Sequence, residues 1–100
     1  MPKAMVGDTI IAESDQTILI EGNHYFPPES IKHGFLSEPT DLHTICHWKG
    51  EASYRDVEVN GNILKNIAWF YPSPQPSAIE KVGGDFSNYI AFYPQVKIID

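Results

Sequence analysis

The stretch Val57-Glu58-Val59-Asn60-Gly61-Asn62-Ile63 decides the fold of this 100-residue chain. Two β-branched valines alternate with a charged residue before Asn60-Gly61, which is typical of a strand with one buried face. Asn-Gly is the strongest hairpin signal in the sequence, because both residues tolerate the positive φ of a tight turn. We therefore expect a hairpin here, within a chain that is mostly β-structure.

The residues before this hairpin predict an irregularity in its first strand. In an extended chain, Ala52 and Tyr54 share one face, and Val57 and Val59 share one face. The two pairs have opposite parity, so we expect a β-bulge near Arg55-Asp56.

The N-terminal part of the chain is punctuated at short intervals. Thr9–Glu13 and Thr17–Glu21 are rich in β-branched residues, and Ser14-Asp15-Gln16 between them has turn chemistry, so we expect a second hairpin. His24–Phe26 is a short extended piece. Pro28–Ile31 is predicted to form one helical turn, because proline suits the first position of a helix.

The C-terminal part contains the only expected helix. Three prolines within Pro72–Ser77 exclude a central strand and predict an extended surface loop. Ser77 is expected to cap a helix over Ala78–Val82, which Gly83-Gly84 ends. The other predicted strands are Leu42–Trp48, Ala68–Tyr71, Tyr89–Tyr93 and Val96–Ile99, the last two separated by a bend at Pro94, while Ile63–Asn66 either continues a strand or forms a turn.

Composition narrows the class of protein. The chain is 42% hydrophobic and 20% charged, as in a globular protein, and its length predicts a single domain over residues 1–100. It has no apolar run of the roughly 20 residues that a membrane span needs, and no signal-peptide core. One cysteine and no signal peptide favour a cytoplasmic location. The net charge of −6 argues against nucleic-acid binding.

Reactive side chains are concentrated in His43–Tyr54, which holds the only cysteine, two of the four histidines and one of the two tryptophans. Cys46 is a candidate nucleophile, since a nearby base activates a thiol. On a strand it faces away from His43 and His47, so His24 from another strand is its better partner. The alternative is a buried cysteine that acts as a small hydrophobe.

A metal site is not expected. Structural zinc requires four Cys or His ligands, usually in close pairs. His43 and His47 lie roughly 13 Å apart on an extended strand, too far to chelate one ion together.

Four segments of the chain resemble a known family, the domain of unknown function 427 family of small, mostly bacterial proteins. They follow the order of the family and are specific together, although each is weak alone. The segments are Ile20–Glu29 (IEGNHYFPPE), Thr44–Tyr54 (TICHWKGEASY), Ala68–Pro74 (AWFYPSP) and Ile90–Tyr93 (IAFY).

The resemblance implies an all-β single domain with twisted antiparallel sheets, similar to the β-tent class of zinc-binding and small-ligand domains. The family has carried a nucleotidyltransferase-like label. This chain has neither an Asp-x-Asp pair nor a phosphate-binding Gly-rich loop to support that activity. It also has His47 where relatives usually have proline, which adds an imidazole beside Cys46.

The aromatic side chains suggest a site. Trp69 and Tyr71 should share a face that is partly open if Phe70 points into the core. Rings with a few polar groups are typical of a small-molecule pocket, although plain core packing is the alternative. The residues expected to line such a pocket are His24, Tyr25, Cys46, Trp48, Lys49, Tyr54, Trp69 and Tyr71.

Three functions follow from these residues. The first is a domain that binds a small anionic or aromatic metabolite without a cofactor, with Lys49 holding the anionic group and His24 forming a hydrogen bond. The second is a small transferase or hydrolase that uses Cys46 or His24. The third is a protein-interaction module that uses exposed edge strands and the loop Pro72–Pro76. The ligand and the oligomeric state are left open.

Overall fold

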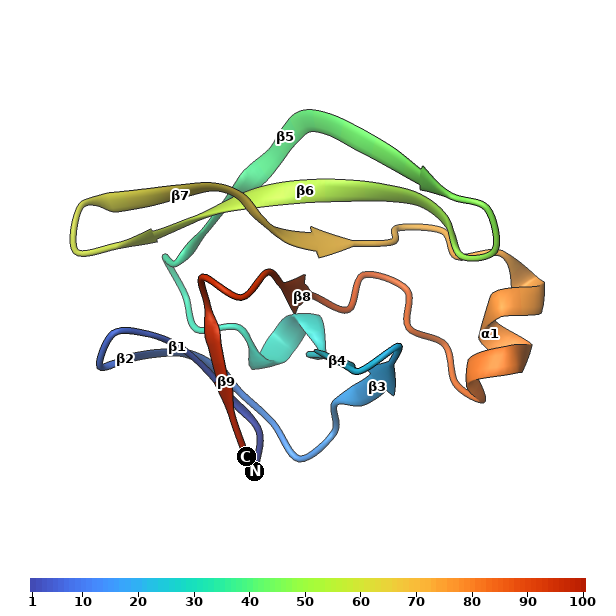
Figure 1. Ribbon diagram of the computed structural model, residues 1–100, viewed down its shortest axis with the longest axis horizontal. Coiled ribbons are helices and arrows are strands. Elements are labelled where there is room, and N and C mark those ends of the chain that lie inside the picture. The colour runs from blue at the N-terminus through green and yellow to red at the C-terminus, as the bar shows by residue number, and fades with distance from the viewer.

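Nine strands in three antiparallel sheets form the chain, which a computed structural model describes over residues 1–100 (Figure 1). The all-β expectation is confirmed. The largest sheet has the order β5–β6–β7–β8, and its long strands form the upper layer of Figure 1. Its strands are β5 (Leu36–Cys46), β6 (Gly50–Val59), β7 (Asn62–Phe70) and β8 (Ala91–Phe92).

The predicted hairpin at Asn60-Gly61 is confirmed. The two residues join β6 to β7 with φ values of 52° and 81°. The strand predicted over Leu42–Trp48 is only partly correct, since β5 starts at Leu36 and ends at Cys46. Ile63–Asn66 continues as strand within β7.

The smaller sheets lie in the lower layer (Figure 1). One has the order β2–β1–β9, and the other pairs β3 with β4. The pairing of β1 with β9 brings the two termini side by side at the bottom of Figure 1. The strands are β1 (Lys3–Val6), β2 (Thr9–Glu13), β3 (Ile18–Ile20), β4 (Asn23–Tyr25) and β9 (Lys97–Ile99).

The predicted hairpin between Thr9–Glu13 and Thr17–Glu21 is wrong. The first strand pairs with β1 and the second with β4, each across a two-residue turn. Gly7 and Gly22 occupy these turns with φ values of 57° and 83°, which suit tight hairpins. Ser14-Asp15-Gln16 has no glycine and serves as a connection between two separate hairpins.

The helices are short. η1 (Pro28–Ser30) is the single turn that was expected. α1 (Pro76–Val82) begins before the predicted position, because Pro76 rather than Ser77 opens its first turn and Gln75 is the cap residue. Gly83 ends the helix in a left-handed conformation, as predicted. No helix is long and apolar enough to cross a bilayer.

The register between β6 and β7 shifts between Arg55 and Val57, as predicted, but the additional residues lie in β7 and not in the first strand of the hairpin, where the bulge was expected. Arg55 pairs with Ala68 and Val57 with Leu64, so β7 contains two more residues than β6 at this point. Asn66 adopts a φ of 54° there, and its backbone N–H donates to Asp56 Oδ1 at 2.7 Å.

Two buried clusters lie on opposite faces of the large sheet. Phe70 belongs to the first cluster, whereas Trp69 and Tyr71 belong to the second. The predicted alternation is therefore confirmed. The expectation of a partly open face at Tyr71 is wrong, because the second cluster buries its ring to 5% exposure.

Candidate functional site

The structure gathers most of the predicted ligand-binding residues in the second cluster, here called the aromatic cluster. Trp69 Nε1 donates to Tyr25 Oη at 3.0 Å, and the rings of Tyr25 and Tyr71 stack with their centroids 6.5 Å apart. Burial raises the pKa of both tyrosine hydroxyls, which therefore stay protonated at neutral pH. The predicted residues that meet here are Tyr25, Cys46, Trp48, Tyr54, Trp69 and Tyr71.

Lys49 covers this cluster and is only 6% exposed. Its ammonium lies 5.1 Å from the Trp48 ring centroid and 5.5 Å from that of Tyr71, and it donates to the Glu21 carboxylate. Burial alone would lower the pKa of Lys49, but the hydrogen bond to Glu21 and the surrounding acidic groups more than offset this and raise it. The chain itself therefore supplies the anionic partner of Lys49.

His24 and Cys46 are not joined by a hydrogen bond. His24 Nδ1 lies 2.9 Å from Thr17 Oγ1, on the side of β4 opposite to Tyr25. Cys46 is a partly buried free thiol at the end of β5. No group of three or more His, Cys, Asp and Glu side chains is placed to hold a metal ion.

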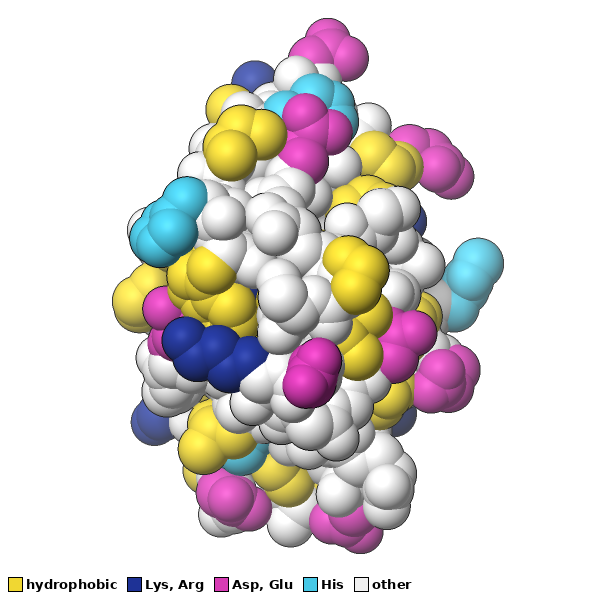
Figure 2. Space-filling view, turned by 90° about the vertical axis from the view of Figure 1, so that its right-hand side faces the viewer, with side chains coloured by type: hydrophobic (Ala, Val, Ile, Leu, Met, Phe, Trp, Pro, Cys, Tyr) yellow, Lys and Arg dark blue, Asp and Glu magenta, His cyan; other side chains and the backbone are white.

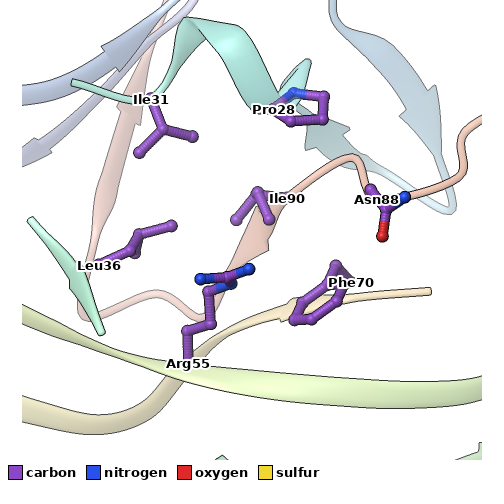
Figure 3. Close-up of a pocket in the computed structure, with 7 residues that line it drawn as sticks. All are labelled: Pro28, Ile31, Leu36, Arg55, Phe70, Asn88 and Ile90. Carbon is purple, nitrogen blue, oxygen red and sulfur yellow. The ribbon is translucent and has the colours of Figure 1, made fainter. Parts of the chain in front are cut away.

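A hollow of about 260 Å³ lies between the large sheet and η1, on the side of the first cluster (Figure 3). We call it the Arg55 hollow, because the guanidinium of Arg55 extends from β6 into the space among the other side chains. It brings together η1, β5, β6, β7 and the segment before β8. Its lining residues are Pro28, Ile31, Leu36, Arg55, Phe70, Asn88 and Ile90.

Arg55 has unsatisfied hydrogen-bonding capacity. Its Nη1 donates to Ser37 O at 2.9 Å, which is the only hydrogen bond of the guanidinium. Its Cζ lies 5.0 Å from the centroid of Phe70, and its Nε is buried without a hydrogen-bond partner. None of the ion pairs of the chain involves Arg55. The hollow thus contains a partly buried cation with no counter-ion.

Two other hollows lie at the surface, and each includes one predicted residue. Trp69 lines a hollow of about 440 Å³ with Tyr93 and Lys97, and Trp48 lines one of about 350 Å³ with Glu21 and Lys81. Neither contains a buried polar atom without a partner. Figure 2 shows the α1 end of the molecule, where acidic, basic and histidine side chains interrupt the apolar surface. This face lacks the broad apolar patch that is typical of a stable interface.

Sequence reasoning missed Arg55 as a site residue. Arg55 shares the parity of Val57 and Val59, which face the first cluster, but the bulge expected at Arg55-Asp56 assigned it to the other face. An arginine at an inward-facing strand position predicts either a buried ion pair or an anion site.

The fold and the hollow define a small antiparallel β-domain with a mostly apolar recess that contains an unpaired guanidinium. The chain matches the model of the family described as domain of unknown function (DUF427) over residues 3–100, and it belongs to that family. No curated protein matches the chain.

Proposed function

We propose that this domain binds a small organic anion in the Arg55 hollow. The observation that supports this most strongly is the partly buried guanidinium with a free Nε and no carboxylate partner. A buried donor without an acceptor costs about 1–3 kcal/mol, so an anion that occupies the hollow would recover this cost. Arginine is also the side chain best suited to hold an oxyanion through two parallel hydrogen bonds.

Arg55 has no carboxylate partner although the chain is rich in acidic residues. The sequence contains 13 Asp and Glu residues and a net charge of −6. With so many carboxylates present, one of them could have been placed beside Arg55, as Glu21 is placed beside Lys49. We infer that the unpaired guanidinium of Arg55 serves a ligand.

Binding of a small ligand is the function expected from the sequence, but we place the site in the Arg55 hollow instead of the aromatic cluster. The anionic group binds Arg55 rather than Lys49, and the aromatic cluster supports the sheet that carries Arg55. The free thiol of Cys46 is consistent with a cytoplasmic setting, which we include in the proposal.

A thermal-shift screen of the full chain with small carboxylates and phosphates tests this function. A ligand at ten times its Kd stabilises by about 1.4 kcal/mol, which raises the Tm of a 100-residue domain by about 6–11 °C. Arg55→Gln should abolish the shift. Lys65→Gln is the matched control, because it removes one exposed cation from β7, outside the hollow, and should preserve the shift. If no anion raises the Tm, or if Arg55→Gln still responds, the proposal is wrong.

A further inference from the structure

We infer that the ligand of the Arg55 hollow is a compact aliphatic monocarboxylate. This inference rests on the proposed function and narrows it, because an anion site alone does not distinguish carboxylates from phosphates. Three features of the hollow carry it: the number of available donors, the absence of a second cation, and the chemistry of the walls.

The donors of Arg55 match one carboxylate. Since Nη1 is bonded to Ser37 O, the edge formed by Nε and Nη2 remains. This edge presents two N–H groups side by side, the spacing at which arginine binds both oxygens of a carboxylate. Nε is buried, so bidentate binding requires a rotation of the guanidinium toward the space in Figure 3.

The charge inside the hollow favours a singly charged ligand. Arg55 is the only Lys or Arg among the seven lining residues. A phosphate monoester carries a charge between −1.5 and −2 at neutral pH, so part of its charge would remain unpaired. A carboxylate is fully neutralised by one guanidinium, which matters in a protein with a net charge of −6.

The walls fit a compact aliphatic body. Four of the lining residues are Pro28, Ile31, Leu36 and Ile90, whereas the one aromatic wall, Phe70, already faces the guanidinium at 5.0 Å. A volume of about 260 Å³ equals roughly eight or nine water molecules in the liquid. A branched acid of four to six carbons therefore fills the space better than a nucleotide or a sugar phosphate.

Isothermal titration calorimetry on the full chain at neutral pH tests the ligand class. The probes are acetate, propionate, isobutyrate and isovalerate, with isovaleramide as the uncharged control and methyl phosphate as the dianionic control. Affinity should rise about fourfold for each buried carbon from acetate to isovalerate. Isovaleramide should bind at least tenfold more weakly than isovalerate, and Arg55→Gln should remove binding of every acid.

The outcomes separate the two proposals. If methyl phosphate binds more tightly than isovalerate and requires Arg55, the hollow is an anion site of another class and only this inference fails. If affinity does not rise from acetate to isovalerate, the aliphatic walls do not contact the ligand and this inference also fails. If no probe binds, and no anion of the thermal-shift screen raises the Tm, both proposals fail.

Discussion

Lys49 and Glu21 form an ion pair in which the lysine side chain is 8% exposed and the carboxylate side chain is 53% exposed. The pair joins the turn before β6 to the turn between β3 and β4, 28 residues apart in sequence. Most of its contribution should come from burial of the lysine side chain, whose ammonium lies over the rings of Trp48 and Tyr71. Loss of packing should therefore matter more than loss of charge.

Two substitutions of Lys49 separate these contributions. Lys49→Met preserves an unbranched stem, and we expect it to lower the free energy of unfolding by about 1 kcal/mol or less. Lys49→Ala removes the stem and should cost about 2–3 kcal/mol. Urea denaturation measures both. Equal losses for the two variants would show that charge, not packing, dominates.

The same ion pair predicts a pH dependence. The hydrogen bond from Lys49 is the main cause that lowers the pKa of Glu21 below its ordinary value of 4.5. A carboxyl group whose pKa is lower in the folded than in the unfolded protein stabilises the fold at pH values above its unfolded-state pKa. This stabilisation disappears as the pH falls through the folded-state pKa. Between neutral pH and about pH 3, wild type should therefore lose more stability than Glu21→Gln. Parallel urea midpoints for both proteins over this range would contradict the assignment.

Tyr25→Phe tests whether the aromatic cluster is structural. The substitution removes the acceptor of the Trp69 Nε1–H group, and the partly exposed indole can recover part of that bond from water. We expect a loss of about 1 kcal/mol in the free energy of unfolding, at the lower end of the penalty for an unpaired donor. Anion affinity should stay within twofold of wild type. A folded Tyr25→Phe protein that no longer binds anions would place the site in the cluster instead.

Ile31→Phe tests the location of the site, because the larger ring extends into the Arg55 hollow (Figure 3). We expect at least a tenfold loss of affinity for isovalerate, with a Tm close to that of wild type. Ile63→Phe makes the same change at a position of β7 that is 55% exposed, and it should bind normally. Unchanged affinity in folded Ile31→Phe would mean that the ligand binds elsewhere.

Features of this fold that depend on a few neighbouring residues could be predicted from the sequence. Asn60-Gly61 predicted its hairpin because a two-residue turn depends on the conformations of those two residues. The pairing of Thr9–Glu13 could not be predicted as reliably, since several turns competed and the glycine turns at Gly7 and Gly22 provided the closer match. Similarly, α1 begins at Pro76, because proline suits the first turn of a helix, whereas Ser77 was expected to cap a helix that starts at Ala78.

The candidate site depended on contacts between distant segments. The predicted rings did converge, because alternation along β7 places Trp69 and Tyr71 on one face. Whether those rings leave a space is decided by Phe86 and Ala78, which fill the cluster from the C-terminal half. The Arg55 hollow has the same origin, since its walls come from Pro28, Leu36 and Ile90. The inward position of Arg55 follows from strand alternation only once β6 is known to be regular, since the bulge expected at Arg55-Asp56 reverses it.

Arg55→Met gives the most direct test of the central claim, which is that this guanidinium serves a ligand rather than the fold. Methionine fills a similar volume without a charge or a donor, so the unpaired Nε disappears together with the bond to Ser37 O. We expect the free energy of unfolding to fall by no more than about 1 kcal/mol, or to rise, because burying a charge is costly. The measurement pairs urea denaturation with isovalerate titration of the same preparation. Retained stability with affinity reduced at least tenfold is the predicted result, and a loss of several kcal/mol with unchanged affinity would contradict the account.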